Sequence, residues 1–327
     1  FSNTAVGASA LCSNTTGRYN SAVGYRAMFN NTTGYANTAV GYYAMLSNTE
    51  GVYNTAVGYS ALSNNTTGYR NTAVGSCALV YNQISGNTAV GYSALKFNTT
   101  GTSHTAVGYC ALSQNTTARW NTAIGYLSMR CNITGESNVA VGQFSLFNNK
   151  GGCANVAVGD STMFGNLYGC RNTALGSYSL GVNYTGNNNT AVGHQAMGSS
   201  GFGSCNTAVG MNALRSNQTN DNTAVGYSAL RNNNTGYSNT AVGTKTLYSN
   251  TVGLSNTAVG NRALFSNTYG GYNTALGNCA LFYNTAGCYN TAVGYKALCC
   301  NTYGKYNTAL GSCALRCNST GCYNTAV

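Results

Sequence analysis

Side chains that could act as acids, bases or metal ligands are few in this sequence. Its 327 residues include 4 Asp or Glu and 2 His, set against 15 Lys or Arg. His104 and His194 stand 90 residues apart, and the carboxylates are isolated from them and from one another. Acid–base catalysis and metal binding both need such groups to converge on one site. The composition therefore predicts that the chain is not an enzyme and holds no cofactor or metal.

Cysteine is the one reactive residue type that is abundant, with 14 copies. Two spacings recur among them. Cysteines 17 residues apart are Cys153 with Cys170 and Cys300 with Cys317; cysteines nine residues apart are Cys279 with Cys288 and Cys313 with Cys322. A zinc site is the alternative, but C-x-x-C pairs and suitably spaced histidines are absent. Many cysteines in a chain without catalytic groups favour disulfides and an oxidising, extracellular or cell-surface location.

Acceptor sequences for N-glycosylation, Asn-x-Ser/Thr, also recur along the chain. They start at Asn14, Asn31, Asn65, Asn98, Asn115, Asn132, Asn183, Asn217, Asn233 and Asn318. All share one position of the repeat described next, in an expected loop, so glycans there would form a stripe along one edge. The alternative is that Asn-Thr-Thr-Gly is favourable turn sequence and contains the acceptor pattern by coincidence. Both interpretations stay open.

These spacings follow from an internal repeat with the consensus N-T-A-V-G-Y-S-A-L-x-x-N-T-T-G-x-x, whose positions are numbered 1 to 17 here. Units start at residues 3, 20, 37, 54, 71, 87, 104, 121, 138, 155, 172, 189, 206, 222, 239, 256, 273, 290, 307 and 324. Two intervals are 16 residues long and the others are 17. Self-similarity at a fixed period is typical of solenoids. No shift in composition interrupts it, so residues 1–327 are predicted to form a single continuous repeat domain.

Variation between the units indicates which positions are buried. Position 3 is always Ala, position 4 is Val, Ile or Leu, position 8 is Ala, Ser or Thr, and position 9 is Leu or Met. Position 7 ranges from Ser9 to Arg26, Phe144 and Lys245, a tolerance expected of a site that faces solvent. We therefore expect a core made of positions 3, 4, 8 and 9, with position 7 exposed.

The unit is too short for two helices and lacks an apolar period of 3.6 residues. Thr-Ala-Val between Asn and Gly predicts one short strand, and Ala-Leu with its neighbours a second. Asn-Thr-Thr-Gly predicts a turn in which Gly accepts a positive φ. The expected fold is all-β: a parallel β-solenoid, or β-roll, of about nineteen 17-residue rungs with two short strands per rung. Asn at positions 1 and 12 would form ladders of paired side-chain amides along the stack.

In a solenoid, the two cysteine spacings predict which cysteines lie close together. Residues 17 apart occupy one position of neighbouring rungs, which lie ~4.8 Å apart, within reach of a disulfide. Residues nine apart within one rung would face each other across a flattened coil. No partner is evident for the remaining cysteines, which are Cys12, Cys77, Cys110, Cys131, Cys205 and Cys299.

The strand predicts self-association. Positions 2 to 5 are all restricted, although neighbouring residues of a strand point to opposite faces. One face would lie inside the solenoid, so we expect the other to be buried against a second copy of the chain. The first and last units also lack polar capping sequence, which favours end-to-end stacking in addition to lateral association.

The N-T-A-V-G-x-x-A-L unit resembles the tandem repeats of extracellular fibre proteins of the phage tail-fibre type. It is also similar to the N-S-x-A-x-G-x-x-S repeat in the head domains of trimeric autotransporter adhesins, and the likeness covers the whole chain. The adhesin resemblance implies a left-handed parallel β-roll, a homotrimer and attachment to surfaces. The unit here is longer than that of the adhesins, and no anchor, stalk or chaperone segment is recognisable.

The net charge of +11 is spread thinly over the variable positions and forms no concentrated stripe, so nucleic-acid binding is not expected. Acidic polysaccharide or a cell surface is a more compatible, weak electrostatic partner. No apolar run reaches the ~18 residues of a membrane span. The sequence thus favours a structural shaft of an extracellular filament, appendage or fibre. An adhesin or tail-fibre module binding cell-surface glycans is the alternative, and an ice-binding solenoid with a threonine ladder at position 2 is a minor one.

Overall fold

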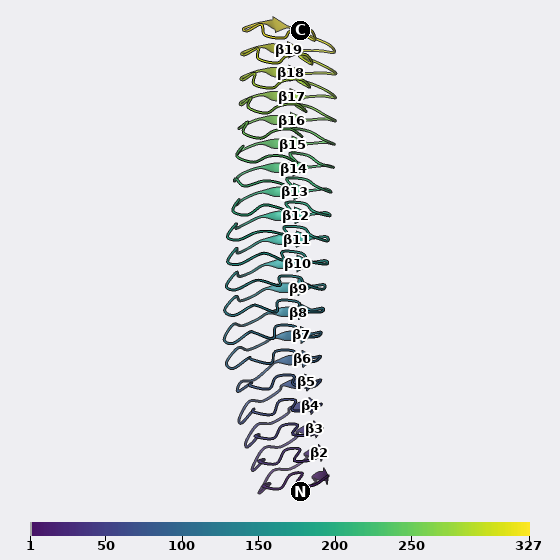
Figure 1. Cartoon of the computed structure of the whole chain (residues 1–327), viewed down its shortest axis with the longest axis vertical. Coiled ribbons are helices and arrows are strands. Elements are labelled where there is room, and N and C mark those ends of the chain that lie inside the picture. The colour runs from purple at the N-terminus through teal and green to yellow at the C-terminus, as the bar shows by residue number, and fades with distance from the viewer. Residues whose placement is uncertain (1) are drawn as a thin grey trace. The chain divides into compact units, whose positions relative to one another are not determined.

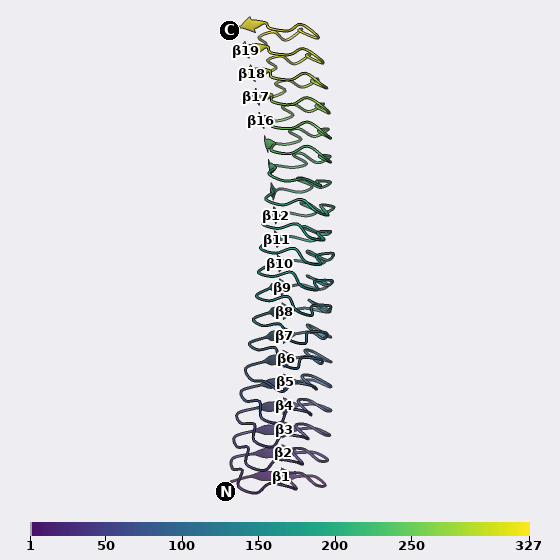
Figure 2. The same cartoon turned by 90° about the vertical axis from the view of Figure 1, so that its left-hand side faces the viewer.

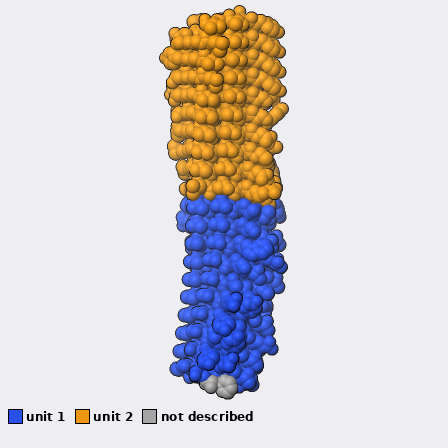
Figure 3. Space-filling view, turned by 180° about the vertical axis from the view of Figure 1, so that it is seen from behind, with its two compact units in different colours: residues 1–168 blue, residues 169–327 orange. Residues whose placement is uncertain are grey.

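The computed structural model describes residues 2–327, which form two compact units, residues 2–168 and residues 169–327 (Figure 3). Each unit contains ten short strands, and the described residues include no helix. The strands of the first unit are β1 (Thr4–Val6), β2 (Ser21–Val23), β3 (Thr38–Val40), β4 (Thr55–Val57), β5 (Thr72–Val74), β6 (Thr88–Val90), β7 (Thr105–Val107), β8 (Thr122–Ile124), β9 (Val139–Val141) and β10 (Val156–Val158). Those of the second are β11 (Thr173–Leu175), β12 (Thr190–Val192), β13 (Thr207–Val209), β14 (Thr223–Val225), β15 (Thr240–Val242), β16 (Thr257–Val259), β17 (Thr274–Leu276), β18 (Thr291–Val293), β19 (Thr308–Leu310) and β20 (Thr325–Ala326).

Within each unit, consecutive strands pair in parallel and in register, one strand per repeat (Figures 1 and 2). Ala39 of β3, for example, lies beside Ala22 of β2 and Ala56 of β4. The predicted all-β parallel solenoid is confirmed, with the repeat as its rung. The prediction of one continuous domain over residues 1–327 depends on how the two units are placed, and it stays a prediction.

The second strand predicted in each rung is wrong. Residues at positions 7 and 9 adopt positive φ values, as at Tyr43 (φ 57°) and Met45 (φ 50°), and the Ala-Leu segment is a series of turns. The physical reason lies in burial: a strand would send Ala44 and Met45 to opposite faces. The left-handed conformations of Tyr43 and Met45 turn the chain so that the side chains of Ala44 and Met45 both point inside, where each is 0% exposed.

The core consists of positions 3, 8 and 9 rather than 3, 4, 8 and 9. Ala39, Ala44 and Met45 are fully buried, whereas Val40 at position 4 is 38% exposed and points outward from the strand. The same alternation that buries position 3 forces positions 2 and 4 to the other face. Position 7 lies at the surface as expected where its side chain is large, as at Arg262, but small residues there such as Ser93 are buried.

Two asparagine ladders line the interior, as predicted. At position 12, Asn48 Nδ2 donates to Asn31 Oδ1 of the preceding rung (2.8 Å) and to the Gly51 carbonyl of its own rung (3.1 Å). At position 1, Asn37 Oδ1 accepts the backbone N–H of Asn54 in the next rung (2.9 Å). These side chains satisfy buried polar groups that the tight turns would otherwise leave unpaired.

Glycine at position 15 is required by space rather than by a positive φ, which corrects the expectation from the turn sequence. A Cβ on Gly287 would contact Asn284 Oδ1 of the same rung and lie 2.5 Å from the carbonyl oxygen of Gly304 in the next rung. Positive φ falls instead on the glycine at position 5, as at Gly58 (φ 133°). The position 15 glycine thus serves close approach alone, whereas the position 5 glycine also has a positive φ; the rung of His104 has Ala118 at position 15.

Candidate functional surfaces

The outward side of each strand forms a surface that we call the threonine–valine face, made of the side chains at positions 2 and 4. Position 2 is Thr, Ser or Val and position 4 is Val, Ile or Leu in every unit, so the face carries no charge. Val23, Ile124 and Val259 at position 4 are each 39% exposed. Burial of this face within one chain is thus excluded for the described rungs.

The threonines of this face differ from those in the loops. At position 13, Thr32 Oγ1 donates to the Thr49 carbonyl of the next rung (3.1 Å), and Thr285 Oγ1 donates to Thr302 in the same way (3.1 Å). At position 2, by contrast, no threonine hydroxyl of the described strands, such as that of Thr55 or Thr105, makes a hydrogen bond within the chain. The threonine–valine face therefore presents hydroxyl groups that remain free to bond water or a partner.

Stacked tyrosines at position 6 flank this face in the first unit. Ring centroids of Tyr25 and Tyr42 are 5.1 Å apart, and those of Tyr42 and Tyr59 are 5.4 Å apart with an 8° angle between planes. A hydrogen bond with Tyr43 raises the pKa of Tyr42 to about 12, so the Tyr42 phenol stays neutral at physiological pH. Neighbouring rings cover one another's faces and leave mainly edges and hydroxyls exposed.

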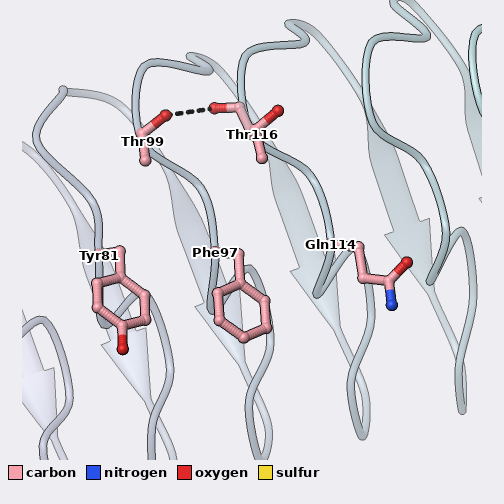
Figure 4. A pocket seen from close by; sticks show the side chains of 5 residues that line it. All are labelled: Tyr81, Phe97, Thr99, Gln114 and Thr116. Atoms are coloured by element: carbon pink, nitrogen blue, oxygen red, sulfur yellow. Dashed lines mark hydrogen bonds between the residues drawn. The ribbon is translucent and has the colours of Figure 1, made fainter.

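A shallow pocket of about 410 Å³ opens on the loop side of the first unit (Figure 4). Tyr81 and Phe97 stack at 5.6 Å along one wall, and Thr99 Oγ1 donates to the Thr116 carbonyl (3.0 Å) along the other. Gln114 completes the lining. The pocket contains an apolar surface and hydroxyls but no carboxylate, histidine or thiol, so it offers no acid–base pair or nucleophile.

The histidines and carboxylates are placed apart. No group of three His, Cys, Asp or Glu side chains in the described part of the chain could hold a metal ion. His194 is exposed, with Nδ1 3.2 Å from the Ser177 carbonyl. His104 is 1% exposed and occupies position 1, where other rungs have a ladder asparagine.

His104 replaces the asparagine by using both ring nitrogens. Nδ1 accepts the backbone N–H of Asn121 (3.2 Å), and Nε2 donates to the Ala118 carbonyl (2.7 Å), which fixes the neutral tautomer. Burial lowers the pKa of His104 from 6.5 to about 4. The only interior histidine of the described rungs is therefore a neutral structural group.

A pH dependence of stability follows from His104. The unfolded chain binds the proton near pH 6.5 and the folded chain only near pH 4, so stability is lost as pH falls between these values. The loss should reach roughly 3 kcal/mol below pH 4. Urea denaturation of the wild type and of His104→Asn from pH 7.5 to 3.5 measures it. The variant restores the ladder asparagine and should lack the loss of stability that His104 causes between pH 6.5 and 4. An equal dependence of stability on pH in both proteins would contradict the role given to His104.

The cysteines predicted to pair lie in different settings. Cys300 donates its backbone N–H to Arg316 (3.0 Å), beside Cys317 on the next rung, so the two thiols do occupy adjacent rungs. Cys279 lines a surface pocket together with Cys299 and Cys300. Cys288 Sγ instead lies 3.4 Å from the Gly271 backbone nitrogen.

The remaining candidates are placed as follows. Cys322 Sγ accepts the backbone N–H of Lys305 (3.4 Å), while Cys313 contacts Ser312 Oγ (4.0 Å). The structure thus gives Cys279 a neighbour, Cys299, that spacing did not suggest, and it places no described contact between the members of either nine-residue pair. Cys153 and Cys170 belong to different units, and their pairing remains a prediction.

The predicted glycosylation sites belong to the position 12 ladder. Eight of them are 0% exposed: Asn31, Asn65, Asn98, Asn115, Asn132, Asn183, Asn217 and Asn233. Nδ2 of Asn65, the atom that would carry the sugar, donates to the Gly68 carbonyl (2.9 Å) inside the rung. A glycan on these eight residues is incompatible with the folded solenoid. Asn14 and Asn318 are partly exposed.

Comparison with known proteins adds no family assignment, because no protein-family model matches the chain and no curated protein matches it. No helix among the described residues has the length and hydrophobicity needed to cross a bilayer. The assignment of position 4 to the core is wrong, because the alternation of side chains along the strand places it on the threonine–valine face. Burial of that face against a second copy stays a prediction.

Proposed function

We propose that this β-solenoid repeat protein forms the shaft of an extracellular filament, appendage or fibre through lateral association of its threonine–valine face with a second copy. The observation that carries the proposal is the uniformity of that face. Val40 and Val225 are 38% and 37% exposed, yet every unit has Val, Ile or Leu at this position. A strand face that only met solvent would tolerate Lys, Glu or Asn, as position 7 tolerates Arg and Lys.

The composition of the face suits a second β-sheet. Valine side chains supply apolar area, and threonine offers a methyl group together with a hydroxyl that can bond across the interface or to trapped water. The basic residues lie at positions 7, 10, 13, 16 and 17, away from the face, so like charges would not oppose each other there. Two such sheets can pack face to face at about 10 Å.

The size of the face is sufficient for a specific contact. Ten strands at ~4.8 Å spacing, with a face about 10 Å wide, give roughly 500 Å² per unit and partner. Two copies would then bury roughly 1,000 Å² through one unit alone, the lower bound for a specific interface.

Lysine at the centre of the face should prevent association. Val57→Lys combined with Val90→Lys places charges on β4 and β6 at half-exposed positions of the first unit. Facing copies would bring like charges together and desolvate them, so we expect association to weaken at least ~100-fold. Sedimentation velocity and light scattering over a concentration series measure this, and circular dichroism checks that the fold is retained.

The matched control is Ser60→Lys at position 7 of the same rung, because Lys245 and Lys296 occupy that position in other rungs. It should associate like the wild type. A wild-type chain that stays monomeric at all concentrations, or association that is unchanged in the Val57→Lys, Val90→Lys protein, would contradict the proposal.

The exposed threonine hydroxyls favour a second candidate, an ice-binding solenoid that uses the same face. Burial of position 2 against a second copy, as the sequence predicts, would argue against this candidate. Within one chain Thr55 and Thr105 are half-exposed, and their hydroxyls make no hydrogen bond. Regular rows of hydroxyl and methyl groups could order a layer of water. Thermal hysteresis of a monomeric wild type, abolished by Val57→Lys with Val90→Lys, would favour this candidate over the fibre shaft.

The glycan-binding adhesin has weaker support. Sugars bind aromatic side chains through the ring faces, but Tyr25, Tyr42 and Tyr59 cover one another's faces by stacking. Acidic polysaccharide remains a compatible weak partner for the scattered positive charge.

A further inference from the structure

Four tyrosines at position 17 of successive rungs form what we call the tyrosine file, consisting of Tyr272, Tyr289, Tyr306 and Tyr323 in the second unit. Consecutive ring centroids are 4.9, 5.0 and 5.0 Å apart, and the ring planes deviate from parallel by only 2°, 2° and 6°. Tyr272, Tyr289 and Tyr306 are 47–50% exposed, so their hydroxyls reach solvent. The file is thus an ordered stack of accessible phenols, and the proposed shaft function does not use it.

The backbone holds these rings in register. Every member has a left-handed backbone, with φ between 57° and 59°. Each backbone N–H donates to the preceding rung: Tyr289 to Gly271 (3.2 Å), Tyr306 to Cys288 (3.2 Å) and Tyr323 to Lys305 (3.0 Å). Identical backbone conformation and identical anchoring project each side chain in the same direction, so the stack is a property of the rung rather than a chance contact.

We infer that the tyrosine file is a site of oxidative cross-linking, at which neighbouring rungs become joined by dityrosine. Each of two phenols loses one electron and one proton to a peroxide oxidant, giving two phenoxyl radicals. The radicals couple through a new C–C bond between ring carbons ortho to the hydroxyls, and both rings then regain aromaticity by proton shifts. In sum, two tyrosines and one hydrogen peroxide yield one dityrosine and two water molecules.

The geometry favours coupling inside one chain. A radical formed on any ring has another phenol about 5 Å away, so the local concentration of partners far exceeds that of other chains. The ring carbons must still approach one another, and half-exposed side chains with two rotatable bonds can do this. The anchored backbone limits the choice of partner to the adjacent rungs. The product would be a covalent link between residues 17 apart.

The test exposes the full chain to a haem peroxidase and hydrogen peroxide at low protein concentration. Thiols are alkylated first, because Cys288 lies close enough to Tyr289 to influence its ionisation and would reduce a tyrosyl radical. Dityrosine fluorescence follows the yield, and mass spectrometry of peptides locates the links, each lighter by two hydrogen atoms. Among links that involve these four residues, we expect the pairs Tyr272–Tyr289, Tyr289–Tyr306 and Tyr306–Tyr323 to predominate, with a yield per chain that does not depend on protein concentration.

The variant Tyr289→Phe keeps an aromatic ring in the stack but removes one phenol. It should abolish the two links that involve residue 289 and leave Tyr306–Tyr323 intact. Tyr303→Phe is the matched control: this tyrosine is 62% exposed, lies on a neighbouring loop and stacks on no described ring, so file links should be unchanged. Links through Tyr303 as frequent as those within the file, or a yield that rises with protein concentration, would overturn the inference.

Because the readout is a link within one chain, failure of lateral association would leave the expected result unchanged. Conversely, an associating protein without file links would retain the proposed shaft function and lose this inference.

Discussion

Replacing Gly58 by Ala is expected to lower the free energy of unfolding by at least about 4 kcal/mol. Gly58 has φ 133°, a region that residues with a Cβ avoid, at a cost of about 1–3 kcal/mol. In addition, the new Cβ would lie 2.7 Å from both the carbonyl carbon and the oxygen of Gly75 in the next rung. These atoms are backbone and cannot move aside without separating the two rungs, whose strands β4 and β5 are paired.

The matched control is Gly86→Ala, also in the first unit. Gly86 has φ 78°, but a Cβ there would meet no atom within 4 Å. It therefore carries the conformational cost without the clash, and we expect a loss of only about 1 kcal/mol. Urea denaturation gives the total effect, and hydrogen exchange of the β4 and β5 amides shows whether the rungs separate locally. Equal losses in both variants would show that inter-rung contact contributes nothing.

Asn267→Asp is expected to cost roughly 4 kcal/mol at pH 7, although the two side chains have the same shape. Asn267 is 0% exposed, and its Nδ2 donates to Asn250 Oδ1 (2.7 Å) and to the Gly270 carbonyl (2.8 Å). A carboxylate would turn an oxygen toward these two acceptors and bury a charge without a partner. Because that environment raises the carboxyl pKa above its unfolded value, the penalty should shrink as pH falls below the raised pKa.

Thermal and urea denaturation at pH 7 and pH 4 test this prediction. The control is Thr268→Ala, one residue along, whose Oγ1 donates to the Thr285 carbonyl (3.1 Å) at the half-buried rim of the rung. It should cost less than about 1 kcal/mol at both pH values. A loss at Asn267 as small as that at Thr268 would mean that the ladder does not stabilise the stack.

The ladder also explains why departures from the repeat occur together. His104 stands where other rungs have asparagine, and in the same rung Ala118 replaces the glycine of position 15. His104 Nε2 donates to the Ala118 carbonyl, the bond that Asn Nδ2 makes to glycine elsewhere. This substitution reproduces the hydrogen-bond pattern, whereas Ser200, which replaces the asparagine of position 12, is buried with a hydroxyl that has no partner in the described structure.

The sequence alone determined the solenoid, its rung length, the asparagine ladders and most of the core. Ala at position 3 and Leu or Met at position 9 could be predicted as buried because each rung meets the same interior, so a single residue type is retained at every repeat. The ladder was predictable for the same reason: identical amides stacked at one strand spacing have each other as partners.

The tertiary structure decided what each restricted position faces. Position 4 is restricted to Val, Ile and Leu and position 3 to Ala, and only the path of the chain shows that Val40 points outward and Ala39 inward. The second strand failed because Tyr43 and Met45 take left-handed conformations that their residue types do not favour. Hydrogen bonds between rungs hold them there, with Tyr43 donating to Tyr25 (3.1 Å) and Met45 to Ala61 (2.9 Å). Those bonds exist only after stacking, so local propensity could not reveal the conformation, nor the tyrosine file that arises from the same backbone state at position 17.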